Sequence, residues 1–210
     1  MGEPKPLPKS FYQKGTADVA RALLGCRLTR RLPDGTTRSV ILVETEAYLG
    51  VKDRAAHTWN GRRTARVEPM WGEGGHAYVY FVYGMHYCMN VVTRGAGEPE
   101  AVLLRAGVSE EEFAEENEKK REISLKRKGN ASGPAKLCEY LQVTRVLSGA
   151  SFSGPELVLS RGPRRRFSVL VGPRVGVDYA GDAAAWPLRF AVAGCHVARP
   201  GALRLFGATS

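Results

Sequence analysis

Apolar and polar positions alternate with a period of two along much of the first half of the chain, a pattern typical of β-strands. Residues 26–32 and 38–47 predict a hairpin, because proline and glycine occupy the turn between them at 33–36. Residues 77–82 and 87–93 predict a second antiparallel pair around a short turn that contains glycine. The first half of the chain is therefore expected to form mostly sheet.

Three further strands are expected. The apolar run AVLLRA at 101–106 indicates a strand that is buried on both faces. In the second half of the chain, residues 156–160 and 188–192 have the composition of short strands.

Helical spacing is found in three places. The apolar positions of residues 16–24 suit a short helix that ends at Gly25. Residues 109–128 predict a longer, solvated helix with a serine N-cap, acids in its first turns and basic residues in its last. A third helix is expected to begin at an N-cap Ser132, with Pro134 near its first turn.

The chain has 210 residues and no internal repeat or break in composition, which predicts one domain. We expect a single compact α+β domain over residues 11–206, with a curved, mostly antiparallel β-sheet, flanking helices and a protruding β-hairpin. Residues 1–10 are expected to be a disordered lead-in, and the chain from Gly207 is expected to fray.

Charge is the first property that bears on a partner. The sequence has 31 Lys and Arg against 21 Asp and Glu, a formal net charge of +10. Six of the acids lie within residues 110–118, so the remaining surface is more basic than the average. This excess favours nucleic acid as a partner, with solubility as the alternative. No apolar run approaches the roughly 20 residues of a membrane span and no signal core begins the chain, which predicts an intracellular protein without membrane contact.

The cysteines give no sign of a metal site. They lie 50 to 62 residues apart without a CxxC pair, which matches neither a zinc site nor a compact disulfide framework. Small buried hydrophobes are the expected role for most of them, and any chemistry is expected to use no cofactor.

The segment VETEAYLG, residues 43–50, ends an apolar strand on two acids. In an extended chain Glu44, Glu46 and Tyr48 point to one face. O-glycosidases use paired carboxylates, but they place them on opposite sides of the scissile bond. Neighbours on one strand face, about 7 Å apart at the Cα atoms, approach from one side. One glutamate is therefore expected to activate a water, and the other to have a structural or electrostatic role.

Aromatic residues give the second chemical signal. Tyr83 falls at the tip of the second predicted hairpin, beside Gly84, where nothing obvious can bury it. Such a residue on a basic protein can wedge between base steps of DNA, while a contact with another copy of the protein is the competing explanation. Spacing alone does not choose between them. Tyr78 and Tyr87 are better explained as ordinary strand aromatics.

A set of flat side chains accompanies the acids. Tyr48, His57 and Tyr80 would supply stacking walls for a flipped purine, and Asn90 an amide or a steric stop. A lone histidine is more often structural, but together with Glu46 the set predicts a base pocket. One carboxylate is enough there to orient and deprotonate the water that hydrolyses an N-glycosidic bond. No nucleotide-binding, zinc or serine-hydrolase motif is present, and no lysine is marked as a Schiff-base nucleophile.

From about Leu23 to Val192 the sequence resembles the alkyladenine (3-methyladenine, or methylpurine) DNA glycosylases of base excision repair. Nine ordered segments carry the resemblance. They are LLG (23–25), VETEAYLG (43–50), AAH (55–57), YVYFVYGMHYCMNV (78–91), AVLLRA (101–106), SGPAKLC (132–138), SRGP (160–163), PRVGV (173–177) and PLRF (187–190).

The resemblance implies roles in catalysis and in DNA binding. Glu46 would be the general base, and Arg105 and the main-chain carbonyl of Val175 would help to hold the attacking water. Tyr83 would intercalate into DNA, with Met85 beside it. Further along the chain, Lys136 would hold a phosphate, although a plain helix cap explains its SGPAKL motif equally well.

The resemblance also implies how a base is recognised. Tyr48, His57 and Tyr80 would stack on the extruded base, the bulk of Asn90 would disfavour the N2 amino group of normal guanine, and Leu103 would support the pocket. The family acts on 3-methyladenine, 7-methylguanine, hypoxanthine and 1,N6-ethenoadenine in duplex DNA, without a metal, a cofactor or a lyase step. We therefore expect a monofunctional glycosylase that needs only a monomer, located in the cytoplasm with the nucleoid if bacterial and in the nucleus if eukaryotic. A non-catalytic nucleic-acid-binding module on the same scaffold is the alternative.

Two loop positions depart from the family pattern. Thr-x-Arg-Asn reads Thr-Ala-Arg-Val here, ending at Val67, and Met-Phe reads Met-Trp, ending at Trp71. Both lie between the pocket and the hairpin, so they bear on substrate range and DNA grip rather than on catalysis. Residues 121–130 do not align clearly with the family.

Overall fold

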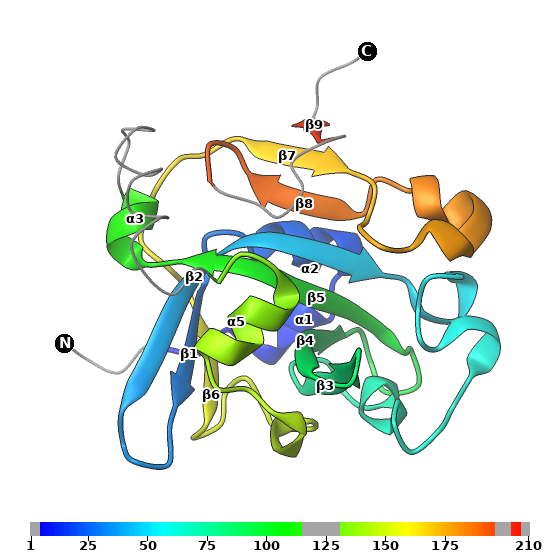
Figure 1. Cartoon of the computed structure of the whole chain (residues 1–210), viewed down its shortest axis with the longest axis horizontal. Helices are drawn as coiled ribbons and strands as arrows, with labels where there is room; N and C mark the ends of the chain where they lie inside the picture. Colours follow the sequence, from blue (N-terminus) through cyan, green and yellow to red (C-terminus); the bar gives the residue numbers. More distant parts are fainter. Residues whose placement is uncertain (1–4, 115–130, 196–202, 207–210) are drawn as a thin grey trace.

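A large antiparallel sheet runs through the part of the chain that the computed structural model describes, residues 5–114, 131–195 and 203–206 (Figure 1). Its main path has the order β3-β4-β5-β2-β8-β7-β9, and β1 pairs with β2 and β6 beside that path. The strands are β1 (Arg27–Arg31), β2 (Thr37–Tyr48), β3 (Ala77–Val82), β4 (His86–Thr93), β5 (Glu100–Val108), β6 (Leu157–Ser160), β7 (Val169–Gly172), β8 (Arg189–Val192) and β9 (Arg204–Leu205). The predicted α+β class with a mostly antiparallel sheet is confirmed, since these pairs are all antiparallel.

Short helices cover both faces of the sheet (Figure 1). Helices α1 (Lys9–Tyr12) and α2 (Thr16–Ala22) lie on one face, where α2 contacts β2 and β5. Helix α5 (Pro134–Tyr140) lies on the other face against β4 and β5. None of the helices among the described residues has the length and apolar character to cross a bilayer.

Several loops contain 3₁₀ turns. They contain η1 (Gly50–Lys52), η2 (Trp59–Gly61), η3 (Glu68–Trp71), η4 (Arg145–Leu147) and η5 (Asp178–Ala185). The loop after β2 and the η5 segment after β7 lie side by side at the right of Figure 1. This is the region where the described chain departs most from regular structure.

The hydrophobic core lies between the sheet and the helices that cover it. Leu23 at the C-cap of α2, Leu28 of β1, Leu104 of β5 and Leu137 of α5 are each fully buried. Burying a leucine side chain stabilises a fold by about 1.5–3 kcal/mol, so these contacts fix the helices against the strands.

Two compensating irregularities interrupt the pairing of β2 with β5. Leu42 pairs with Gly107 but Glu44 pairs with Ala106, so β2 has an extra residue at Val43. The next pair joins Thr45 to Leu104, which leaves Arg105 as the extra residue of β5. Bulges re-aim side chains and are frequent beside active sites. Here they place Arg105 of β5 beside Glu44 and Glu46 of β2.

Helix α2 and the seven strands predicted from the sequence are confirmed, and their ends differ from the prediction by no more than two residues. Strands β7 and β9 were not predicted. The cap prediction for α5 was wrong, because Gly133 with a φ of 109° occupies the N-cap and Ser132 instead forms a bridge with Ala106. Serine is the more usual N-cap residue, but the N-cap of α5 has a positive φ, which glycine tolerates.

Two predicted segments fall partly outside the described residues. Helix α3 (Glu110–Ala114) begins the helix predicted for 109–128, and the Ser109 hydroxyl accepts a hydrogen bond from the Glu112 amide at 3.1 Å. The remainder of that range lies outside the described part. In the expected lead-in, Leu7 is buried and its amide donates to the Leu159 carbonyl at 2.8 Å, so the chain contacts β6 at this residue.

Gly107→Ala is expected to lower the free energy of unfolding by about 1–3 kcal/mol, as overpacking a core does. A Cβ added at Gly107 would lie 2.6 Å from Cγ2 and 2.7 Å from Cβ of Val40. Urea denaturation measures the effect. Gly95→Ala is the control, because its added Cβ would meet only Glu98 Oε2 at 3.6 Å. Equal stability of the two variants would contradict the tight packing described for the bulge.

Candidate active site

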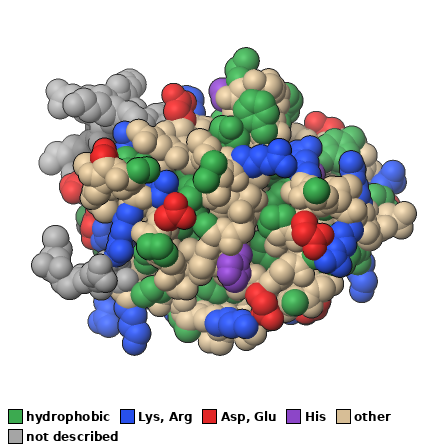
Figure 2. Space-filling model, turned by 90° about the horizontal axis from the view of Figure 1, so that it is seen from below, with side chains coloured by type: hydrophobic (Ala, Val, Ile, Leu, Met, Phe, Trp, Pro, Cys, Tyr) green, Lys and Arg blue, Asp and Glu red, His purple; other side chains and the backbone are tan. Residues whose placement is uncertain are grey.

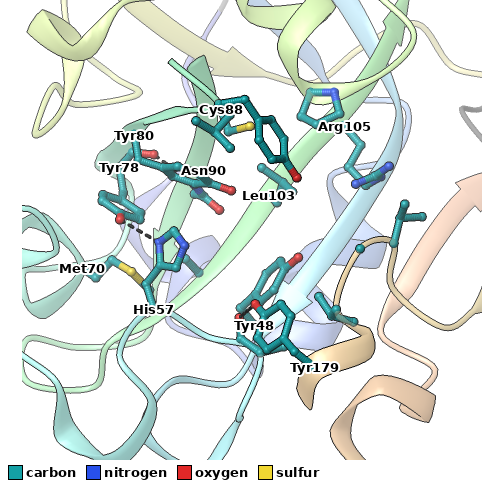
Figure 3. Close-up of a pocket in the computed structure, with 18 residues that line it drawn as sticks. Tyr48, His57, Met70, Tyr78, Tyr80, Cys88, Asn90, Leu103, Arg105 and Tyr179 are labelled. Atoms are coloured by element: carbon teal, nitrogen blue, oxygen red, sulfur yellow. Dashed lines mark hydrogen bonds between the residues drawn. The ribbon is translucent and has the colours of Figure 1, made fainter. Parts of the chain in front are cut away.

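A cavity of about 400 Å³ opens between the sheet and the loops that follow β2 and β7 (Figure 3). All five residues predicted to bind substrate line it: Tyr48 on β2, His57 in the loop after β2, Tyr80 on β3, Asn90 on β4 and Leu103 on β5. Tyr48 lies on one side and His57 and Asn90 on the other (Figure 3). A cavity of this size suits a small ligand or one base.

Glu46 lies directly behind the cavity lining. Its side chain is fully buried and is not itself part of the lining. Its Oε1 accepts a hydrogen bond from the Val175 amide at 2.8 Å, and its Oε2 accepts from the Tyr48 hydroxyl at 3.0 Å and from Arg105 Nη1 at 3.2 Å. All three donors line the cavity, so the carboxylate adjoins it through its own partners.

Glu44 is the second buried acid and has a different environment. Its Oε1 accepts hydrogen bonds from Arg105 Nε at 2.8 Å and from Arg189 Nε at 2.7 Å. Arg105 therefore bridges both glutamates, while Arg189 comes from β8 on the other side of β2. Two carboxylates and two guanidinium groups are thus enclosed together, which offsets the cost of burying either charge alone.

Burial is the main influence on the protonation of Glu46. Loss of water around the carboxylate raises its pKa above the ordinary value, and the charge of Arg105 and the hydrogen bonds from Val175 and Tyr48 oppose that shift. A carboxylate with a raised pKa is a stronger base than a solvated one. The environment therefore favours proton uptake by Glu46.

The histidine of the pocket is held in an aromatic cluster. His57 Nδ1 lies 2.8 Å from the Tyr78 hydroxyl, and the His57 ring meets the Tyr80 ring edge to face with centroids 4.6 Å apart. Burial, together with the charges of Arg66 and Arg62, lowers the pKa of His57 to about 4. The imidazole is consequently neutral at physiological pH and presents one face to the cavity (Figure 3).

The hairpin between β3 and β4 carries the most exposed aromatic residue described. Tyr83 is 88% exposed and still contributes to the rim of the cavity. Its φ is 54° and that of Gly84 is 70°, and the Met85 amide donates to the Val82 carbonyl at 3.3 Å to close the turn. A bulky residue rarely adopts positive φ, and such outliers are found where function requires a side chain in a fixed place.

Asn90 is placed by a main-chain contact. Its Nδ2 donates to the Tyr78 carbonyl at 3.1 Å across the β3–β4 pair, which fixes the amide against the cavity wall. Two of the predicted DNA contacts lie outside the lining: Met85 is exposed on the hairpin, and Lys136 is exposed on α5, whose first residue Pro134 does line the cavity.

A family model described as Methylpurine-DNA glycosylase (MPG) matches residues 10–196. The chain belongs to the methylpurine-DNA glycosylase family. The resemblance seen in the sequence is confirmed, and membership makes the protein a DNA glycosylase and thus an enzyme of DNA repair.

Curated relatives of similar length support the same assignment. A protein of Desulfitobacterium hafniense is 42% identical over 192 residues, covering 89% of this chain and 94% of the relative. Proteins of Bacillus cereus and Bacillus cytotoxicus are each 42% identical over 194 residues, covering 87% of this chain and 93% and 94% of the relatives. All three carry the name "Putative 3-methyladenine DNA glycosylase".

Several residues around this glycosylase cavity were not predicted. Arg189 and the fully buried Asp53 and Arg174 read as ordinary charged residues in the sequence, and their pairing depends on strands and loops far apart in the chain. Tyr179 of η5 is 67% exposed beside Tyr48, and its position follows only from the fold of the loop after β7 (Figure 3).

The two positions that depart from the family pattern are the N-cap and the last residue of η3. Val67 is buried with Met70 and Tyr78 in a small cluster that backs the cavity. Trp71 is partly buried and lies 5.1 Å from the guanidinium carbon of Arg63. Neither side chain lines the cavity. In the described part of the chain, no group of three or more His, Cys, Asp and Glu side chains is arranged to hold a metal ion.

Glu44→Gln is expected to lower the free energy of unfolding by about 3–5 kcal/mol, because it removes one charge from a buried network and leaves its partners uncompensated. Urea denaturation at neutral pH measures the loss. Glu68→Gln is the matched control, since Glu68 pairs with Arg63 on the surface. Exposed pairs contribute little, so this control is expected to lose far less stability. A similar loss in both variants would contradict the role assigned to the buried network.

Proposed function

We propose that the protein is a monofunctional DNA glycosylase of base excision repair that removes alkylated, deaminated or etheno purines from duplex DNA. The damaged nucleotide rotates out of the helix into the cavity, and a water activated by Glu46 hydrolyses the N-glycosidic bond. The product is an abasic site, with no cut of the strand by the enzyme. The observation that carries this proposal is the buried Glu46 carboxylate, whose three hydrogen-bond donors all line one base-sized cavity.

The chemical step follows from the position of this carboxylate. As the bond between C1′ and the base nitrogen breaks, its electron pair leaves with the base and positive charge develops on the sugar. Glu46 stabilises that charge, and it accepts a proton from the water whose oxygen bonds to C1′. Arg105 keeps the carboxylate oriented and ionised through its hydrogen bond. A base that is already cationic leaves as a neutral molecule, and this accounts for a preference for alkylated purines.

Recognition of the base relies on the aromatic walls. A purine between Tyr48 and the His57–Tyr80 pair would be stacked on both faces. Asn90 would stand against the base edge, where an amino group on C2 of a normal guanine would meet its fixed amide. The pocket would therefore select against normal guanine by shape. It would accept 3-methyladenine, the lesion in the name of the relatives, together with hypoxanthine and ethenoadenine.

Binding of duplex DNA involves the hairpin and the charged surface. Tyr83 would fill the gap left in the base stack, with Met85 beside it, while Lys136 would contact a phosphate. Lys and Arg side chains are spread over the face seen in Figure 2, with fewer Asp and Glu among them. Such a surface attracts the phosphate backbone at any sequence. Because one flipped nucleotide occupies one cavity, a monomer is sufficient, and the protein would act wherever its chromosome lies.

Glu46→Gln is expected to reduce base release by about 100-fold or more, because removal of a positioned general base typically costs 10²–10⁴-fold. The test uses a labelled duplex with one hypoxanthine or 1,N6-ethenoadenine under single-turnover conditions, followed by hot alkali to cut abasic sites. The variant should still bind the lesion duplex. Omitting the alkali tests the absence of a lyase step, since an intact strand is then expected.

Each outcome of this test has a definite meaning. Release by the wild-type protein and binding without release by Glu46→Gln support the proposal. If both proteins bind lesion DNA and neither releases a base, the protein is a non-catalytic binding module and the glutamates are structural. Strand cutting without alkali would contradict the monofunctional mechanism.

Tyr83→Ala is expected to weaken binding to lesion duplexes by about 10- to 100-fold, since stacking on a base contributes roughly 1–3 kcal/mol. Fold stability should change little, because Tyr83 is 88% exposed. Fluorescence anisotropy is measured with duplexes and with lesion-bearing single strands. The comparison separates intercalation into a duplex from a general contribution of Tyr83 to DNA binding. A wedge acts only on duplexes, so equal losses on both substrates would count against intercalation. Val146→Ala, at a position with 88% exposure on η4, is the control.

A further inference from the structure

A buried ion pair lies beside the cavity without facing into it. The side chains of Arg174 and Asp53 are both fully enclosed, and neither lines the cavity. Arg174 Nη2 donates to Asp53 Oδ1 at 2.9 Å, and Arg174 Nη1 donates to Asp53 Oδ2. The two groups form a bidentate pair, the arrangement in which arginine fixes a carboxylate most rigidly.

Arg174 contacts or adjoins a hydrogen-bond donor to each carboxylate oxygen of Glu46. Its guanidinium carbon lies 4.7 Å from the centre of the Tyr48 ring, and the Tyr48 hydroxyl donates to Glu46 Oε2. Its neighbour in the chain, Val175, donates its amide to Glu46 Oε1. Two of the three hydrogen bonds that Glu46 accepts thus come from groups that Arg174 holds by stacking or by covalent connection.

Arg174 also ties these groups to the main chain of two other segments. Its Nη1 donates to the Ala47 carbonyl at 3.0 Å, next to Tyr48, and its Nη2 donates to the Ala183 carbonyl at 3.0 Å in η5. The guanidinium is therefore fixed at four acceptors from three segments. A shift of its position would move Tyr48 and the Val175 amide together.

Asp53 anchors the opposite side of the pair. Its Oδ2 accepts a hydrogen bond from the Leu49 amide at 3.0 Å, and its Oδ1 accepts from the Ala55 amide at 3.0 Å. Those two amides bracket the loop that follows β2 and leads to His57. The carboxylate consequently connects the loop that carries one pocket wall to the segment that carries Val175.

From these contacts we propose that Arg174 and Asp53 are a positioning pair that holds Glu46 in its ionised, catalytic orientation by fixing the Tyr48 hydroxyl and the Val175 amide. The inference rests on the proposed function of Glu46 as general base. A buried ion pair is a weak source of stability, because desolvation offsets most of its attraction, but it fixes geometry well. Arg174 and Asp53 touch no substrate in this arrangement and act only through the two donors.

Other charged and titratable groups also face Glu46 and must be distinguished from this pair. They are Glu44 and Tyr48 on β2, Tyr80 on β3, Cys88 on β4, Arg105 on β5 and Arg189 on β8. Apart from Tyr48, none of them contacts Arg174 or Asp53 through a hydrogen bond described above, so they are expected to stay in place when either residue is replaced. A change in the titration of Glu46 in those variants therefore reports the loss of the two fixed donors.

Arg174→Lys is the main test, because lysine keeps the charge but cannot form the bidentate pair or stack as a plane. Losing donors to the carboxylate favours its protonated form, so the pKa of Glu46 should rise. The acidic limb of the single-turnover pH profile should move to higher pH, and the maximal rate should fall by up to about 100-fold, as misplacement of a catalytic group by about 1 Å does. Asp53→Asn should give a change in the same direction.

Two comparisons separate positioning from a loss of stability. Leu28→Ala removes a buried side chain of β1 that does not line the cavity, and it should lower the melting temperature without moving the acidic limb. Tyr48→Phe removes one of the two donors directly. If Arg174 acts through Tyr48, the shifts of Arg174→Lys and Tyr48→Phe will not add in the double variant.

Titration of the Glu46 side-chain carboxyl carbon by NMR gives a readout that does not depend on activity. A wild-type protein that releases no base would overturn the proposed function, while the carboxyl titration would still decide the positioning role. An unchanged Glu46 titration in both Arg174→Lys and Asp53→Asn would overturn the inference. If either variant fails to fold, the other one and Tyr48→Phe, compared with Leu28→Ala, decide it.

Discussion

Two carboxylates removed from water on one strand require positive charge within hydrogen-bonding distance, and this requirement organises the centre of the molecule. Glu44 and Glu46 of β2 obtain it from Arg105 of β5 and Arg189 of β8, the strands on either side. The paired bulges at Val43 and Arg105 are the adjustment of the backbone that makes this possible. A regular pairing would leave Arg105 directed elsewhere, so the strand order, the irregular register and the ionised acid depend on one another.

The sheet and the irregular loops contribute different residues to the site. Strands β2 to β5 hold the acids, their arginine and most of the aromatic wall in a rigid sheet. The loops after β2 and β7 complete the cavity with His57 and Val175, and they lack a ladder of backbone hydrogen bonds of their own. The ion pair between Asp53 and Arg174 connects the two loops to each other instead. The hairpin tip is the opposite case, since Tyr83 is 88% exposed and its position follows from the turn closed by the Met85 amide.

Much of this arrangement could be predicted from the sequence, and the failures have physical causes. Alternation located the strands that have one buried face, and the shared face of Glu44, Glu46 and Tyr48 followed from strand geometry alone. Strand β7 was missed because the basic, proline-containing segment before it hides a short apolar run. The N-cap of α5 was misplaced because local preference favours serine, whereas the path of the chain demanded a positive φ at Gly133. Buried arginines such as Arg174 give no local signal, because burial of a charge is decided by a partner distant in the chain.

The recessed position of Glu46 has a consequence for the design of inhibitors. A planar base analogue that fills the cavity would meet the walls formed by Tyr48 and His57 but would leave Glu46 behind its three donors. The affinity of such an analogue would then come from stacking, and other proteins that bind flat aromatic molecules would bind it as well. In the mechanism proposed above, a compound with a protonated nitrogen at the place of C1′ would carry its charge toward the carboxylate and imitate the sugar cation. Selective inhibition of this glycosylase thus depends on the sugar part of the ligand more than on its base.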